Sequence, residues 1–186
     1  MVNACLFFYG KSGSGKSFAG DLLAELLGWQ LYHADQDITP EMQTALANQQ
    51  PFTNAMRDQF FYNVGEKIQQ LNSQHHRLIV TQGAYKQKHR DYLKSKLPQL
   101  YLVQVNCPDE QIMQRIEQRK SGISLASAKA LLADFEASVQ GDYVLENGGS
   151  RQQLIASMVH MAEQMPELFS TEELATLTQA AKVAQG

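Results

Sequence analysis

Short apolar runs alternate along the chain with longer stretches in which apolar residues recur every three or four positions. The apolar runs predict strands at residues 4–9, 30–33, 78–81, 100–106 and 143–146. The periodic stretches predict helices at residues 16–27, 41–48, 55–72, 89–96 and 108–120. This alternation is typical of βαβ units, in which helices cover both faces of a parallel sheet, and it predicts an α/β fold.

The end of the chain predicts one more helix. Ser170-Thr-Glu-Glu173 has the pattern of a capping box, and Leu174 and Leu177 follow on one side of the helix it would open. We expect this helix to pack on its own domain, because a covered apolar stripe is the commoner arrangement, and a homodimer is the alternative. The expected organisation is one domain over residues 1–165 and a C-terminal helical extension over residues 166–186.

The composition is that of an ordinary globular protein. Of 186 residues, 44% are apolar and 19% are charged, which suits a single domain with its own core. The net charge of −3 leaves no broad basic surface for nucleic acid. The first residues lack the basic start of a signal peptide, and no apolar run reaches 18 residues, so we expect a cytoplasmic protein without a membrane partner.

The two cysteines, Cys5 and Cys107, are expected at opposite ends of neighbouring strands. Their Cα atoms would then lie too far apart for a disulfide, so both thiols should be reduced.

A phosphate-binding loop stands between the first predicted strand and the first predicted helix. The segment Gly10-Lys-Ser-Gly-Ser-Gly15-Lys16-Ser17 matches the Walker A pattern in its required strand–loop–helix context. Backbone N–H groups of such a loop cradle phosphates, the lysine reaches the β- and γ-phosphates, and the last hydroxyl binds Mg²⁺. We therefore expect ATP and Mg²⁺ as cofactors. The expected ATP-binding residues are Gly10, Ser12, Gly13, Ser14, Gly15, Lys16 and Ser17, and the expected metal ligand is Ser17.

Two classes of P-loop protein fit the rest of the chain poorly. GTPases need a guanine-reading N-K-x-D segment, which is missing. Motor-type ATPases usually end a strand in a Walker B aspartate, whereas the strand predicted at residues 78–81 is followed by Gln82 and Gly83. The pattern therefore favours the small-molecule kinases.

Five segments support a more specific resemblance. They are YGKSGSGKS, HADQD, the run from Pro51 to Asp58, the run from Gln82 to Asp91, and Arg115-x-x-x-Arg119-Lys120. Between Tyr9 and about Gln164 the chain resembles the small P-loop carbohydrate kinases of the gluconokinase type, with shikimate kinases as close relatives. The resemblance implies a five-stranded parallel sheet in the order 2-3-1-4-5, a helical substrate insert at about residues 38–75 and a lid at about 119–128.

The resemblance also implies an activity, the transfer of the ATP γ-phosphoryl group to a hydroxyl of a sugar acid, with gluconate giving 6-phosphogluconate. Alternatives are a kinase of the same fold for another polyol, shikimate or a nucleotide, and a catalytically silent nucleotide-binding regulator.

Several site residues follow from the same resemblance. Asp35 would be the catalytic base at the end of a strand and would also bind the acceptor, with His33 on the same side. Arg57, Lys86 and Arg90 would bind the acceptor, Arg115 the nucleotide, and Arg119 would act with Lys16 in catalysis as the lid arginine. Structural alternatives are a turn for Asp35, a solvated helix start for Lys86 and Arg90, and surface ion pairs for the two arginines of the lid helix.

The chain departs from the family pattern in the acceptor half. His33 replaces an aspartate, Ala55 and Met56 replace acidic residues, and Ser121-Gly122-Ile123 stands where the lid has Gly-His. These departures bear on the acceptor more than on phosphoryl transfer.

Overall fold

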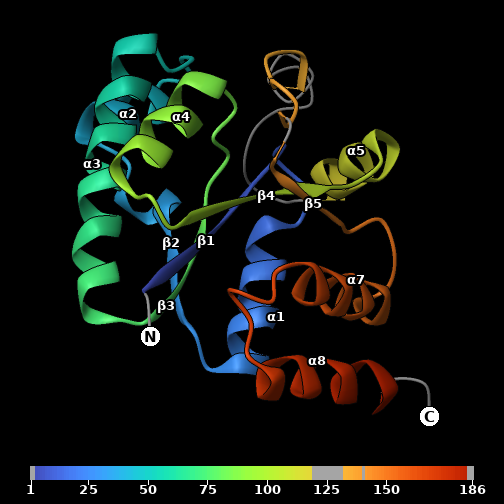
Figure 1. The fold of residues 1–186 in the computed structure, drawn as a ribbon. Helices are drawn as coiled ribbons and strands as arrows, with labels where there is room; N and C mark the ends of the chain where they lie inside the picture. Colours follow the sequence, from blue (N-terminus) through green and yellow to red (C-terminus); the bar gives the residue numbers. More distant parts are fainter. Residues whose placement is uncertain (1–2, 119–131, 140, 184–186) are drawn as a thin grey trace.

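The computed structural model describes residues 3–118, 132–139 and 141–183. Its centre is a five-stranded parallel sheet in the order β2-β3-β1-β4-β5 (Figure 1). The strands are β1 (Ala4–Tyr9), β2 (Gln30–His33), β3 (Arg77–Thr81), β4 (Leu100–Asn106) and β5 (Tyr143–Glu146). The predicted strands and their order are confirmed, and only β3 begins one residue earlier than expected.

Helices cover both faces of the sheet (Figure 1). One face carries α2 (Pro40–Ala47), α3 (Asn54–Gln74) and α4 (Gln87–Lys96), and the other carries α1 (Lys16–Leu27), α7 (Arg151–Gln164) and α8 (Thr171–Val183). α5 (Asp109–Gln118) follows β4, and a short 3₁₀ helix, η1 (Ala34–Asp37), follows β2. Within the described ranges, every helix is too short or too polar to span a lipid bilayer.

The alternation of side chains along β1 supplies both halves of the core. Leu6 and Phe8 point to the face of α1, α7 and α8, whereas Phe7 and Tyr9 point to the face of α2, α3 and α4. All four side chains are fully buried. The central strand is therefore apolar on both faces, as expected for a sheet covered on both sides.

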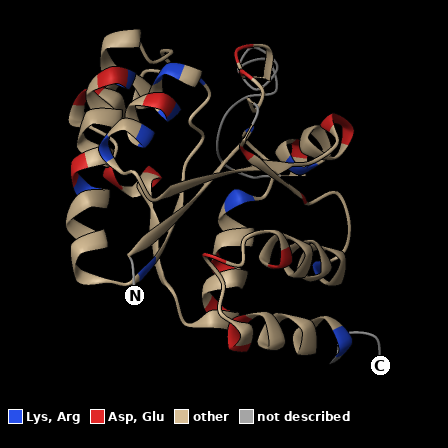
Figure 2. Ribbon diagram, viewed as in Figure 1, with Lys and Arg blue, Asp and Glu red and all other residues tan. Residues whose placement is uncertain are grey.

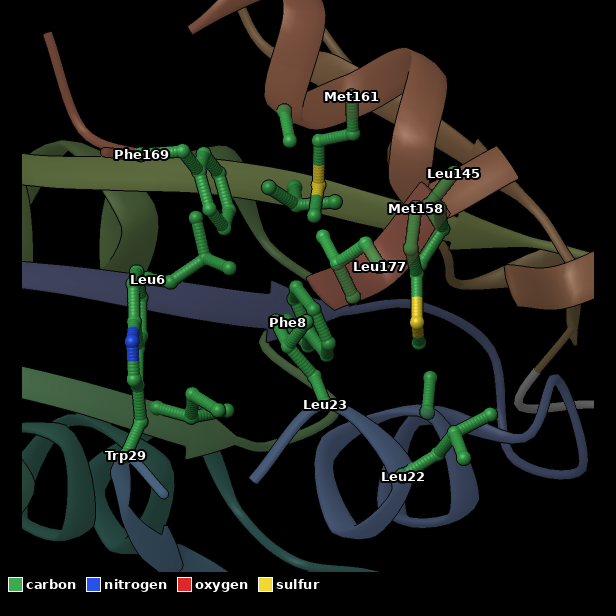
Figure 3. Close-up of a cluster of buried hydrophobic side chains, with 14 of the residues drawn as sticks. Leu6, Phe8, Leu22, Leu23, Trp29, Leu145, Met158, Met161, Phe169 and Leu177 are labelled. Carbon is green, nitrogen blue, oxygen red and sulfur yellow. The ribbon is translucent and has the colours of Figure 1, made fainter. Parts of the chain in front are cut away.

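The C-terminal helix packs on its own domain, as predicted. Figure 3 shows Leu177 of α8 in the same cluster as Leu6 and Phe8. Trp29 stacks on Phe169 just before α8, with ring centroids 5.2 Å apart. Its indole N–H also donates to Glu173 at 2.6 Å, so α8 is fixed to the turn between α1 and β2.

The helix α7 was not predicted, although its start carries a readable signal. The Ser150 hydroxyl accepts from the Gln153 N–H, and the Gln153 side chain accepts from the Ser150 N–H. This reciprocal pair is a capping box, and it satisfies two backbone donors at a helix start.

Replacing Ser150 by alanine should lower the free energy of unfolding by about 1 kcal/mol, because the cap hydroxyl is lost. Urea unfolding of Ser150→Ala beside Ser73→Ala tests this. The Ser73 hydroxyl only donates to the carbonyl of Gln70 in its own helix, so its removal should have little effect. Equal destabilisation by the two substitutions would contradict the capping role.

Both cysteines are free and buried. Burial raises the pKa of the Cys5 thiol well above its ordinary value. Cys5 lies near the start of β1 and Cys107 just after the end of β4.

Candidate active site

The phosphate loop lies at the carboxyl ends of the strands, between β1 and the first turn of α1. Gly15 adopts a left-handed conformation with φ of 89°, and a Cβ atom there would collide with the amide of Asn147. Asn147 in turn donates to the carbonyl of Ser14 at 2.8 Å. The loop therefore needs glycine at this position, both for its backbone and for the close approach of Asn147.

The residues present fit the phosphates of a nucleotide. The Lys16 ammonium lies across the loop, 3.1 Å from the carbonyl oxygen of Lys11, and the N-terminus of α1 contributes partial positive charge. Ser17 is exposed in the first turn of α1. The described residues contain no cluster of three or more acidic, His or Cys side chains for a metal. Mg²⁺ bound largely through phosphates and water needs no such cluster, and Ser17 as its protein ligand stays a prediction.

Removing the loop lysine should weaken ATP binding at least tenfold, because Lys16→Ala deletes the charge that the loop directs at the phosphates. Calorimetric titration with ATP measures the effect, and thermal unfolding checks that the fold persists. Lys11→Ala is the matched control, since the Lys11 ammonium pairs with exposed Asp109 at 2.6 Å outside the loop. Equal ATP affinity in Lys16→Ala and the unsubstituted protein would contradict the assignment.

Arg115 stabilises the phosphate loop by hydrogen bonds to backbone carbonyls. Its guanidinium donates to the carbonyls of Gly13 at 3.2 Å, Ser14 at 3.4 Å and Asn147 at 3.3 Å. The residue therefore lies beside the phosphate loop. Its observed hydrogen bonds hold the shape of the loop, and direct contact with a nucleotide stays a prediction.

Asp35 lies at the same edge of the sheet as the phosphate loop, but not on a strand. β2 ends at His33, and Asp35 belongs to the 3₁₀ helix that follows. The carboxylate is exposed and accepts from the Gln82 amide at 2.9 Å, just beyond the end of β3. An exposed carboxylate at this edge is suited to accept a proton from a bound hydroxyl.

The expected pairing of Asp35 with His33 is wrong. The prediction placed both residues on one strand, where every second side chain points to the same face. The strand ends at His33, however, and Asp35 lies in the 3₁₀ helix that follows. The His33 ring instead bridges Thr81, with Nδ1 at 2.7 Å from Oγ1, and Asp21 of α1, with Nε2 at 3.0 Å from Oδ1. His33 therefore ties β2 to β3 and α1.

The structure brings Arg57 and Lys86 together on one carboxylate. Asp134 lies 3.0 Å from the Arg57 guanidinium and 2.5 Å from the Lys86 ammonium, and Lys86 also pairs with Glu136 at 3.4 Å. The Lys86 ammonium, by its hydrogen bond, holds the pKa of Asp134 below its ordinary value. Two of the four residues predicted to bind the acceptor thus share one place, although neither Asp134 nor Glu136 was expected there.

Arg90 has a structural role instead of the predicted contact with the acceptor. The side chain is completely buried, and its guanidinium stacks over the Tyr9 ring at 4.6 Å. Its N–H groups donate to the carbonyls of Ala84, Tyr85, Glu136 and Ala137 and to the Gln87 side chain. With every N–H bonded to protein, the guanidinium has no donor to offer a ligand.

The sequence prediction missed Tyr85. Its hydroxyl accepts from the N–H of Ser12 in the phosphate loop at 2.6 Å, and burial raises its pKa. The ring meets Phe135 edge-on, with centroids 5.4 Å apart.

The predicted lid at residues 119–128, with Arg119 and the Ser121-Gly122-Ile123 departure, lies outside the described residues. The predicted substrate insert contains α2 and α3, and Arg57 lies near the start of α3.

A family described as an AAA domain matches residues 6–130. No curated protein matches the sequence.

Three solved structures share the fold. A sugar kinase from Janibacter sp. HTCC2649 is 22% identical, with a TM-score of 0.76 over 90% of this chain and 99% of its own. A gluconokinase from Sinorhizobium meliloti 1021 is 20% identical, with a TM-score of 0.72 over 87% and 95% of the two chains. The APS kinase CysC from Mycobacterium tuberculosis, in complex with AMPPNP and APS, is 17% identical, with a TM-score of 0.63 over 86% and 96%. The fold is thus that of small P-loop kinases.

Proposed function

Because the chain belongs to the AAA domain family of P-loop proteins, we propose that it transfers the γ-phosphoryl group of ATP to a hydroxyl of a small polyhydroxylated acceptor. One observation carries the proposal: a complete phosphate loop and the exposed carboxylate of Asp35 lie at the same edge of the sheet. The kinases of the same fold, one of them in complex with AMPPNP, support it.

Each group has a role in such a transfer. The loop N–H groups and Lys16 would hold the phosphates, and Ser17 would contribute to the metal shell. Bound Mg²⁺ would neutralise charge on the transferring phosphoryl group. Asp35 would accept the proton of the attacking hydroxyl, and Arg119 is proposed, by resemblance alone, to close over the phosphates. Such enzymes work mainly by positioning and charge neutralisation.

Gluconate is the first acceptor to test, because the segments around the phosphate loop and Lys86 resemble the gluconokinase type. Another polyol, shikimate or a nucleotide would use the same machinery, and a silent nucleotide-binding regulator would use only the loop.

An ADP-release assay over gluconate, glucitol, glycerol, shikimate and AMP separates these functions. We expect ADP formation that depends on one acceptor, with a phosphorylated product of matching mass. ATP binding without ADP formation for any acceptor would favour the regulator and contradict the proposal.

A further inference from the structure

The acceptor side of the site carries equal numbers of positive and negative groups in direct contact. Arg57 and Lys86 supply two positive charges, and Asp134 and Glu136 supply two negative charges within 3.4 Å of them. Both helices that flank this place, α3 and α4, carry acidic and basic residues, and basic residues predominate on α4 (Figure 2). The cations that would attract an acidic acceptor are therefore already paired within the chain.

We propose that Asp134 and Glu136 make this site selective for an uncharged polyol over a sugar acid. The inference rests on the proposed kinase function and specifies its acceptor class.

The first support is the fit of Asp134 between the two cations. One carboxylate oxygen faces the Arg57 guanidinium and the other faces the Lys86 ammonium, so a single carboxylate bridges both groups. This is the arrangement that an acceptor carboxylate would itself adopt. An acidic acceptor would have to displace Asp134 and leave it unpaired close to the new negative charge.

The second support is the anchoring of the segment that carries the two carboxylates. The Glu136 N–H donates to the carbonyl of Tyr85 at 2.9 Å, and the carbonyl of Glu136 accepts from buried Arg90 at 2.9 Å. Phe135 packs between Tyr9 and Tyr85, with ring centroids 6.3 and 5.4 Å away. The Ser138 N–H donates to Gln104 of β4 at 2.8 Å. Moving the backbone of this segment would disturb these contacts, so the segment that carries Asp134 is held in place by the fold.

The third support is the hydrogen-bonding capacity that remains for a neutral ligand. Each carboxylate has about four lone-pair sites, and the ion pairs use only some of them. The Asp134 side chain keeps 35% of its surface exposed and that of Glu136 keeps 48%. Their free lone pairs accept hydrogen bonds from the hydroxyls of a polyol. A carboxylate has no hydrogen to donate and is repelled.

The experiment compares acceptors in pairs that differ by one carboxylate: gluconate with glucitol, and glycerate with glycerol. In the unsubstituted protein, kcat/KM should be at least about tenfold higher for the alcohol of a pair, because an unpaired like charge is costly. In Asp134→Asn the acid-to-alcohol ratio should rise at least about tenfold, because the amide still accepts hydrogen bonds but no longer repels a carboxylate.

Two further variants provide a weaker version of the change and a control. Glu136→Gln should shift the ratio in the same direction by a smaller factor, since its pairing with Lys86 is longer. Glu163→Gln removes an equally exposed carboxylate on α7, across the sheet, and should leave the ratio unchanged. Thermal unfolding of each variant confirms that it is folded.

Calorimetric titration of the protein with each member of a pair, in the presence of AMPPNP, separates a failure of this inference from a failure of the proposed function. ADP formation with none of the acceptors would refute the kinase function, whereas binding still reports which member of a pair the site prefers. Preference for the acid in the unsubstituted protein, binding of neither member, or an unchanged ratio in Asp134→Asn would overturn the inference.

Discussion

Replacing Asp35 by asparagine is expected to lower kcat by roughly 10²-fold or more while ATP binding stays nearly intact, the range for loss of a positioned base. Asparagine keeps the size of the side chain and can still accept from Gln82, so the substitution removes chiefly the basic oxygen. The carboxylate lies on a different loop from the phosphate-binding residues, which explains why ATP affinity should persist.

The measurement is kcat with the acceptor found in the ADP-release assay, together with calorimetric titration of ATP. Asp37→Asn is a matched control in the same 3₁₀ helix, because Asp37 accepts from the Tyr32 hydroxyl at 2.8 Å and an asparagine oxygen can do the same. We expect little change in that control. An unchanged kcat in Asp35→Asn would show that the carboxylate is structural and that the base lies elsewhere.

The second large effect concerns Arg90. Arg90→Met should lower the free energy of unfolding by roughly 3 kcal/mol, because several buried carbonyls lose a charged donor at once. Methionine fills much of the volume of the stem, so the loss reports mainly on the hydrogen bonds. The variant should still fold, since small domains are commonly stable by more than this amount.

Chemical unfolding of Arg90→Met and Lys88→Met tests the assignment. Lys88 is exposed beside Arg90 and pairs with exposed Asp58 at 2.6 Å, so its loss should leave stability nearly unchanged. If Arg90→Met were as stable as the unsubstituted protein but lost acceptor affinity, Arg90 would be a ligand-binding residue after all.

Local pattern was enough to predict the strands and the phosphate loop. A strand covered on both faces is a short, mainly apolar run. Residues 4–9 are such a run, and so are residues 100–106 apart from Gln104 and Asn106. The Walker A spacing fixes the geometry of its own loop, because glycine positions and the helix start are local properties. The helix α7 was missed although Ser150 and Gln153 form a readable cap.

The sequence alone could not predict contacts between residues that lie far apart in the chain. Arg90 stands among Lys86, Lys88 and His89, which is typical of a solvated helix start. It is buried because a segment 46 residues further along covers it. Asp134 lies 77 residues from Arg57, and no periodicity or spacing indicates that they pair. The acceptor site depends on such contacts, so its charge balance became visible only in three dimensions.

The proposed reaction moves the γ-phosphoryl group of ATP to an acceptor hydroxyl. ³¹P nuclear magnetic resonance follows this transfer directly in a mixture of protein, ATP, Mg²⁺ and acceptor. We expect a phosphomonoester signal that grows in step with ADP and is strongly reduced in Lys16→Ala. Growth of inorganic phosphate alone, or no loss of ATP with any acceptor, would contradict it.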